Sequence, residues 1–389
     1  MINKNILEAK MKYLYRLIYT FLLMGCLLII GCAYIQKHSV ENINIQQDIT
    51  EIAIDIMKRH NIPAMVFAVV SKDEIIVQKA LGHRIITEIN EEPTIDINDY
   101  FHLGSNGKAI AGFIAAYFVE QGKISWDTKF FELFPELIES SNPDYLEITL
   151  VDLFSHRAGV KQYNNFEDFM NRPEFTGNIQ ERRKHFVEYV LTLPKIENEK
   201  NWNYSNAGYS IAGVMLERVS SQSWEELSRD VLTEKADIEF VFGWPNRNFE
   251  NQPYGHSMAT DSEGNKYFTQ IPASTSYDLA LFEPAGDFSM NLKNYIRFIQ
   301  MNLKGLSGKD NFLSSETYNY LFKAKDDYAI GWLNIIRDGT PISTHSGSDG
   351  TFYATVYINR DTLTAYIILA NTGTLGVYEL SRKLREIYK

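Results

Sequence analysis

The tetrapeptide Ser-Asn-Gly-Lys at residues 105–108 opens the stretch that decides the fold, and the apolar run AIAGFIAAYFV follows it at 109–119. No other Ser-x-x-Lys occurs in the 389 residues. The run is too apolar for a surface helix, so it predicts a buried helix. Residues at i and i+3 share a helix face, and we therefore expect the Lys108 amine to reach the Ser105 hydroxyl near the helix N-terminus.

This pair suits nucleophilic catalysis if the lysine is partly desolvated. A serine hydroxyl is a weak nucleophile until a base takes its proton, and a lysine in an apolar site can be that base. The alternative is an N-cap serine followed by a solvated lysine. The tetrapeptide alone does not decide between the two.

Two further motifs lie downstream of this pair. Tyr-Ser-Asn at residues 204–206 leads into a helical run at 210–219, and Thr-His-Ser-Gly-Ser-Asp-Gly occupies 344–350 between two strand-like stretches. In this order, the three motifs resemble the Ser-x-x-Lys, Tyr-x-Asn and Lys/His-x-Gly elements of penicillin-recognising serine hydrolases. The Tyr-Ser-Asn form is similar to that of class C β-lactamases and D-alanyl-D-alanine peptidases.

Shorter matches extend the resemblance over roughly residues 45–389. They are Leu-Phe-Ser-His-Arg-Ala-Gly-Val at 153–160, Pro-Ala-Gly-Asp at 284–287 and Gly-Trp at 331–332. A second Tyr-x-Asn lies at 163–165. The Ala-Gly-Tyr and the helical run that follow Tyr204 favour Tyr204 as the family tyrosine, which leaves Tyr163 as a loop aromatic packed on the surface.

Hydrophobic periodicity predicts strands near both ends of the chain and helices between them. We expect an α/β (α+β) fold in which one antiparallel sheet is flanked by terminal helices and carries a mostly helical inserted domain, as the resemblance to β-lactamases and transpeptidases also implies. One hydrolase domain would span residues 44–389, with the sheet from about 44–104 and 326–389 and the helical part from about 105–325. The predicted strands are 64–70, 74–80, 328–337, 352–359 and 362–370, and the predicted terminal helices are 46–59 and 376–388.

The N-terminus has the pattern of an export signal. Basic residues precede an uncharged apolar run at 17–31, which ends in Gly31 and Cys32 and resembles a bacterial lipobox. We therefore expect residues 1–32 to be a lipoprotein-type signal with a lipid on Cys32, and 33–43 to be a polar tether. The alternatives are Cys26, after a shorter apolar run, and an uncleaved anchor. The predicted location is the bacterial cell envelope, outside the cytoplasm and anchored to a membrane.

Composition excludes several function classes. The formal net charge is −11 and no basic run occurs, which argues against a nucleic-acid partner. The eight histidines form neither a His-x-x-x-His nor a His-Glu-x-x-His pair, so we expect no metal site and no cofactor. Both cysteines lie within residues 1–32, which leaves the body without a disulfide.

The resemblance implies a role for each site residue. Ser105 would attack a carbonyl, and Lys108 and Tyr204 would share the proton transfer, with the positive charge of Lys108 lowering the pKa of Tyr204. Asn206 would hold the substrate amide and the lysine. The remaining substrate-binding and oxyanion residues would be His345, Gly347 and Ser348, with the backbone N–H groups of Ser105 and Ser348 as the oxyanion donors.

Two departures from the family pattern bear on the substrate. A histidine, His345, stands where β-lactamases usually carry a lysine that holds a carboxylate, and its unshifted pKa near 6.5 predicts binding that changes around neutrality. Asp287 replaces the second glycine of a Pro-Ala-Gly-Gly turn, either bordering the cleft, where it would repel carboxylates, or capping a helix at 290–301. We expect acyl-enzyme hydrolysis of an amide or ester, best a D-amino-acid-containing peptide; the alternatives are an esterase, a weak β-lactamase or a non-catalytic sensor module.

Overall fold

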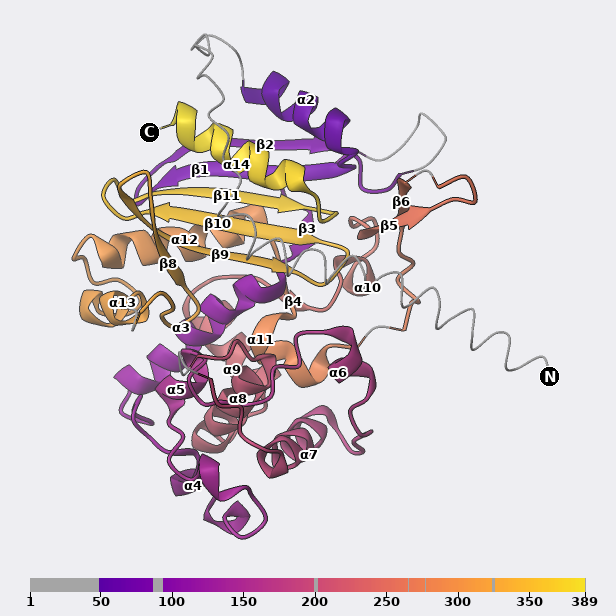
Figure 1. Cartoon of the computed structure of the whole chain (residues 1–389). Helices are drawn as coiled ribbons and strands as arrows, with labels where there is room; N and C mark the ends of the chain where they lie inside the picture. The colour runs from indigo at the N-terminus through magenta and orange to yellow at the C-terminus, as the bar shows by residue number, and fades with distance from the viewer. Residues whose placement is uncertain are drawn as a thin grey trace, which may run out of the picture.

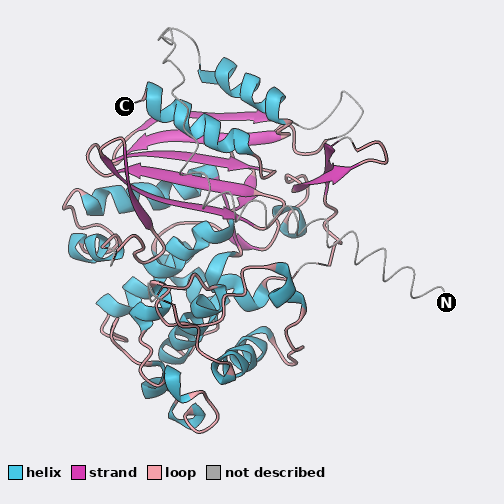
Figure 2. Ribbon diagram, viewed as in Figure 1, coloured by secondary structure: helices cyan, strands magenta, loops and turns pink. Residues whose placement is uncertain are grey.

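A six-stranded antiparallel sheet is assembled from the two ends of the chain in the computed structural model (Figures 1 and 2). The structure describes residues 49–86, 94–198, 202–264, 266–276, 278–323 and 326–388. The predicted signal at 1–32, including Cys32, and the tether at 33–43 lie outside these residues. In spatial order the strands are β2 (Ile75–Gly82), β1 (Ala64–Ser71), β11 (Thr364–Ala370), β10 (Tyr353–Asn359), β9 (Thr340–Ser348) and β8 (Leu333–Arg337).

The sheet is buried on both faces, which explains why its central strands are apolar throughout rather than alternating. Successive side chains of a strand point to opposite faces. Met65, Phe67 and Val69 of β1 therefore join a core with the terminal helices α2 (Ile49–His60) and α14 (Leu375–Ile387). The alternate residues of β1 join the larger core on the other face, where α12 (Leu292–Leu306) packs. Figure 1 shows α2 and α14 together on one side of the sheet and α12 on the other.

The helical half lies below the sheet in Figure 2 and is organised around α3 (Gly107–Glu120). Nearly every residue of α3 is buried, as its apolar sequence predicts. The other helices of this half are α4 (Phe130–Leu133), α5 (Leu150–Phe154), α6 (Phe166–Met170), α7 (Ile179–Thr192), α8 (Asn206–Ser220), α9 (Trp224–Ser228) and α11 (Glu283–Gly286).

The antiparallel sheet with terminal helices and a helical insert agrees with the fold class predicted from sequence. Two local predictions differ. β8 begins at Leu333 instead of 328, because Gly331 has a φ of +73° and turns the chain before the strand. The motif at 344–350 lies mostly inside β9 rather than between strands. Residues 240–275 contain the short elements β4 (Val241–Phe242), α10 (Pro245–Asn248), β5 (His256–Thr260) and β6 (Lys266–Gln270).

A small second sheet of three strands fixes the segment that precedes Ser105. β3 (Tyr100–His102) and β4 both pair with β7 (Phe288–Asn291), so the strand that precedes Ser105 is fixed beside the strand that follows Asp287. α13 (Ser315–Leu321) packs on α12 and α3. Within the described part of the chain, none of the helices has the length and apolar character needed to cross a membrane.

Candidate active site

Ser105 lies in a single 3₁₀ turn, Gly104–Asn106, that runs directly into α3. Its side chain is partly exposed, whereas Lys108, one turn further on, is completely buried. The residue at the N-cap of α3 is Asn106. The alternative of a capping serine with a solvated lysine therefore does not hold, because neither half of it matches the structure.

The Lys108 amine has three oxygen neighbours. Its Nζ lies 2.7 Å from Asn206 Oδ1, 2.9 Å from the Ala285 carbonyl oxygen and 3.2 Å from Ser105 Oγ. Burial lowers the pKa of Lys108 well below its usual value. A neutral amine has two N–H groups, which the two carbonyl oxygens can accept, and its lone pair is then directed at Ser105. This geometry suits a general base.

Tyr204 is a second side chain in contact with Ser105. Its hydroxyl hydrogen-bonds Ser105, and Lys108 Nζ lies 4.8 Å from the centre of its ring. Burial raises the pKa of Tyr204, and the hydrogen bond to Ser105 offsets this only in part. The expectation that Lys108 lowers the pKa of Tyr204 is therefore wrong. A neutral lysine carries no charge to stabilise a phenolate, so the tyrosine remains a phenol that can pass a proton.

Asn206 is held at the N-terminus of α8 by the segment after α5. The Ser205 side chain caps α8 by accepting from the Gly208 N–H, and the Ser205 N–H donates to His156 Nδ1 at 3.1 Å. Asn206 Nδ2 donates to the Tyr163 carbonyl oxygen at 2.9 Å, which turns its Oδ1 towards Lys108. The motif at 153–160 thus has a structural role beside the tyrosine motif.

Tyr163 does not compete with Tyr204 for the site. Its ring is buried and packs on Phe186 and Phe282 in the helical half, with centroids 5.1 and 5.9 Å apart. The expected surface position is wrong, because these aromatic neighbours enclose the ring. Only the backbone carbonyl of Tyr163 contributes to the site, and sequence reasoning missed that contribution because any residue type can supply it.

Glycines allow the backbone around Ser105 to approach closely. A side chain on Gly347 of β9 would collide with the Ser105 nitrogen, and one on Gly104 would collide with the Ser348 nitrogen. The amides of Ser105 and Ser348 are therefore neighbours. β8 pairs with β9 only as far as Thr344, so residues 345–348 lie beyond the end of β8 on that edge of the sheet.

His345 is buried, and its surroundings oppose a cationic role. Its Nε2 lies 3.0 Å from the Tyr328 hydroxyl and its Nδ1 lies 2.9 Å from the Ser346 carbonyl oxygen. Burial lowers the pKa of His345 to about 3. The imidazole is thus neutral at pH 7, donating from Nδ1 and accepting from Tyr328. The expected titration near neutrality is wrong for this reason.

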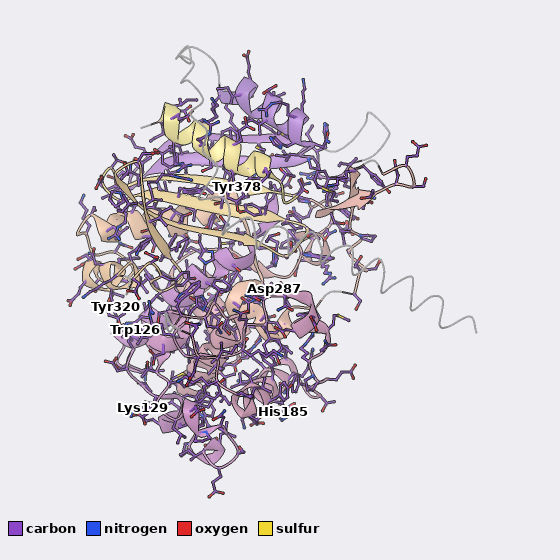
Figure 3. All side chains as sticks on the ribbon, in the orientation of Figure 1. Trp126, Lys129, His185, Asp287, Tyr320 and Tyr378 are labelled. Carbon is purple, nitrogen blue, oxygen red and sulfur yellow. The ribbon has the colours of Figure 1, made fainter. Side chains whose placement is uncertain are left out.

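Asp287 neither borders an open cleft nor caps the helix that follows it, α12. It is 7% exposed and contacts His102 of β3, while Asn291 is the N-cap of α12. Both readings of this residue are therefore wrong. They failed because its partner lies 185 positions away in sequence. Asp287 belongs to the region where the sheet and the helical half meet (Figure 3).

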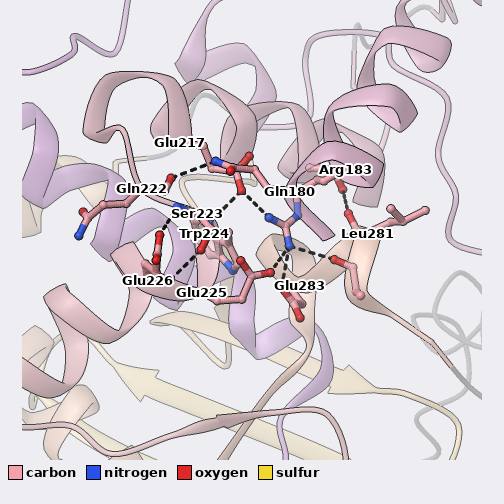
Figure 4. A network of polar contacts seen from close by, with 12 residues as sticks. Gln180, Arg183, Glu217, Gln222, Ser223, Trp224, Glu225, Glu226, Leu281 and Glu283 are labelled. Atoms are coloured by element: carbon pink, nitrogen blue, oxygen red, sulfur yellow. Dashed lines mark hydrogen bonds and ion pairs between the residues drawn. The ribbon is translucent and has the colours of Figure 1, made fainter. Parts of the chain in front are cut away.

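The other end of the same turn is held by a buried charge cluster in the helical half (Figure 4). The Arg183 guanidinium, fully buried on α7, lies 2.5 Å from Glu217, 2.5 Å from Glu225 and 2.7 Å from Glu283. Burial raises the pKa of Glu283 well above its usual range, and a hydrogen bond to Glu225 adds to this shift. Glu283 stands two residues before Ala285, so this cluster supports the carbonyl that Lys108 contacts.

The fold agrees with the comparison with protein families. The sequence model of the Beta-lactamase family matches residues 49–387. The chain therefore belongs to the beta-lactamase family of serine hydrolases. Among the described residues, no group of three or more His, Cys, Asp or Glu side chains is arranged so that it could hold a metal ion.

Individual relatives are distant. Protein flp of Staphylococcus aureus (strain MW2) is 20% identical over 350 residues, 87% of this chain, and the chain spans 65% of its length. The class C beta lactamase from Rhodobacter sphaeroides superposes with a TM-score of 0.67 at 15% identity, over 88% of this chain and 100% of that one. The octameric penicillin-binding protein homologue from Pyrococcus abyssi gives 0.67 at 16%, over 87% and 76%. At these identities, the solved structures show a shared fold.

Proposed function

We propose that the chain is a serine hydrolase that forms an acyl-enzyme on Ser105. The observation that carries this proposal is the coordination of Lys108. Its two N–H groups have acceptors in Asn206 Oδ1 and the Ala285 carbonyl, and the third direction, at 3.2 Å, is Ser105 Oγ. A structural lysine would not need a serine there, and a buried amine with a lowered pKa is suited to accept a proton.

The reaction follows from these positions. Ser105 Oγ attacks the substrate carbonyl carbon as its proton moves to Lys108 Nζ. The negative oxygen that forms lies against the N–H groups of Ser105 and Ser348, and one such donor is worth about 3 kcal/mol in the transition state. Collapse breaks the bond to the leaving amine or alcohol, which takes a proton through Tyr204. Water then attacks the ester on Ser105 by the same proton path in reverse and releases the acid.

We assign the substrate as a D-amino-acid-containing peptide. The edge of β9 at 345–348, which β8 leaves unpaired, can pair with an extended peptide backbone. The neutral His345 supplies no permanent cation for a carboxylate, which favours slow turnover of penicillins. A simple ester is the second candidate, because the same edge and the same base serve an ester carbonyl.

The test is mass spectrometry of the intact protein after reaction with a fluorophosphonate, a p-nitrophenyl ester and penicillin. We expect a single adduct on Ser105 with the first two, absent in Ser105→Ala, and turnover of a peptide ending in D-alanine. Absence of any Ser105 adduct would refute the proposal. An adduct that forms and never turns over would instead favour the sensor module.

We also propose that the protein is exported and held at a bacterial membrane by a lipid on Cys32. The support is the basic start, the apolar run at 17–31 and the Gly31-Cys32 pair. Metabolic labelling with a fatty acid should mark the wild type and not Cys32→Ala. Labelling that persists in Cys32→Ala and disappears in Cys26→Ala would move the lipid to Cys26.

A further inference from the structure

Three buried titratable side chains from distant segments meet beside the turn that carries Ser105. His102 ends β3, Asp287 follows α11, and Asp349 follows β9. His102 Nε2 lies 2.9 Å from Asp287 Oδ1, and its Nδ1 lies 3.6 Å from Asp349 Oδ2. The exposed fractions of the three residues are 0%, 7% and 7%. None of the three side chains takes part in the proton transfer proposed above.

Each member of this triad is tied to a backbone segment that the reaction uses. The Gly104 N–H, one residue before Ser105, donates to His102 Nδ1 at 3.2 Å. Asp349 follows Ser348 directly and accepts from the backbone N–H groups of residues 351 and 352 at 2.8 and 2.7 Å, which fixes the turn after β9. Asp287 stands two residues after Ala285, whose carbonyl contacts Lys108.

The hydrogen bonds define the protonation of the histidine. Because Nδ1 accepts from the Gly104 N–H, the ring proton is on Nε2, and Nε2–H donates to Asp287. Burial alone would lower the pKa of His102, but the two carboxylates outweigh it and raise that pKa. Burial also raises the pKa of Asp287. The pair therefore holds its shared proton firmly, which suits a rigid link.

We propose that His102, Asp287 and Asp349 are positioning residues that set the two oxyanion donors, the N–H groups of Ser105 and Ser348, at a fixed separation. The inference rests on the proposed function. His102 acts through Gly104 on the Ser105 amide, Asp349 acts on the Ser348 amide, and Asp287 holds the histidine between them. Because Asn291 already caps α12, a capping role does not explain Asp287, whereas this positioning role does.

The experiment compares hydrolysis of an ester with that of the matched thionoester by the full-length chain. Sulfur is larger than oxygen and accepts hydrogen bonds poorly, so the ester-to-thionoester rate ratio reports the quality of the oxyanion hole. Misplacing a donor costs up to its full value of 10²–10³ in rate. We expect Asp287→Ala to lower kcat for the ester by about 10- to 100-fold with little change in KM, and to lower the ratio about tenfold.

Two further variants separate positioning from general loss of structure. Asp287→Asn keeps an oxygen that accepts from His102 Nε2–H, and it should restore most of the ratio. Asn302→Ala removes an equally buried polar side chain on α12, away from this cluster, and should reduce stability without changing the ratio. If Asp287→Ala does not fold, His102→Leu, which removes the acceptor for Gly104 N–H, should lower the ratio in its place.

The outcomes distinguish this inference from the proposed function. A wild type that forms no acyl-enzyme refutes the proposed function, and the oxyanion role with it. A wild type that acylates Ser105, with a ratio that is unchanged in Asp287→Ala and in His102→Leu, refutes the positioning role alone. An equal loss of rate on both substrates also refutes it, since that result describes damage outside the oxyanion hole.

Discussion

The two halves of the molecule contribute to the site in different ways. The helical half supplies the two side chains of the proposed proton path, Lys108 and Tyr204, together with Asn206, which hydrogen-bonds Lys108. The sheet half supplies the proposed oxyanion donors, backbone N–H groups at the end of β9 and beside β3, next to the His102 cluster. Substitution can remove a side chain completely, but it can only displace a backbone group. We therefore expect larger losses from the helical half.

Lys108→Met gives the largest expected effect and tests the helical side of this comparison. The proton acceptor is lost, so acylation of Ser105 should fall by roughly 10³- to 10⁴-fold. Folding should not suffer. Burial lowers the pKa of Lys108 in the folded protein, so the unfolded chain binds more protons and the stability of the wild type rises as pH increases towards the usual lysine pKa.

Stopped-flow acylation and urea unfolding at pH 7.5 and 9.5 measure both effects. The Met variant should be at least as stable as the wild type at pH 7.5 and should lose the rise with pH. A variant that acylates at the wild-type rate would remove Lys108 from the proton path and overturn the division between the halves.

Arg183→Met tests the support beneath the helical half. The substitution leaves three acidic side chains without their cation in a largely buried site, and we expect a loss of about 3–5 kcal/mol in the free energy of unfolding. The matched control is Arg182→Met on the same helix. Its partner Asp278 is half-exposed, so the loss there should remain below about 1 kcal/mol.

Urea denaturation of both variants decides the point. Equal losses in Arg182→Met and Arg183→Met would show that the cluster contributes no more than a surface pair.

Tyr204→Phe should reduce turnover about 10²-fold, because the ring remains and only the proton relay is lost. Tyr163→Phe is the control. It carries the second Tyr-x-Asn motif, but only its backbone carbonyl reaches the site, so turnover should stay within about threefold. Steady-state rates on one ester suffice. A larger loss of turnover in Tyr163→Phe than in Tyr204→Phe would show that Tyr204 is the wrong tyrosine. The proton relay would then lie elsewhere in the helical half.

Sequence patterns predicted the features that depend on neighbouring residues in the chain. The apolar run of α3 and the i, i+3 spacing placed Lys108 under Ser105, and the apolar stretch of β1 indicated a buried strand. The order of the strands in the sheet was not predicted, because pairing depends on contacts between the two ends of the chain. β9 was missed because the polar, glycine-containing segment at 344–348 has a weak strand pattern, and pairing with β10 overrides it.

Two kinds of contact in the site could not be predicted. One kind uses backbone atoms and so requires no particular residue type, and the other joins residues that are far apart in the sequence. The backbone carbonyl of Tyr163 accepts from Asn206 Nδ2, and that of Ala285 accepts from Lys108 Nζ. Every residue has such a carbonyl, so the sequence does not mark these two. The pair His102–Asp287 joins positions 185 residues apart, and the family motif suggested a glycine at 287. Buried surroundings, which the sequence does not display, also moved the pKa of His345 and of Tyr204 away from the expected directions.

His345→Gln has the smallest expected effect at neutral pH and tests the sheet half. Glutamine can donate to the Ser346 carbonyl or accept from Tyr328, and the imidazole it replaces is already neutral, so stability at pH 7.5 should change by no more than about 1 kcal/mol. The difference should appear in acid. With a folded-state pKa of about 3 and an unfolded value near 6.5, protons bind the unfolded chain first as pH falls below 6.5. The wild type should therefore lose about 2 kcal/mol more than the variant between pH 7.5 and pH 5. Urea unfolding at the two pH values measures this loss, and His185→Gln, at an exposed histidine on α7, should behave as the wild type.

Hydrolysis of a peptide with a free carboxylate should show no step between pH 6 and 8 that His345→Gln abolishes. Such a step would mean that the imidazolium forms at the strand edge, and the sheet half would then contribute a charged side chain as well as its backbone.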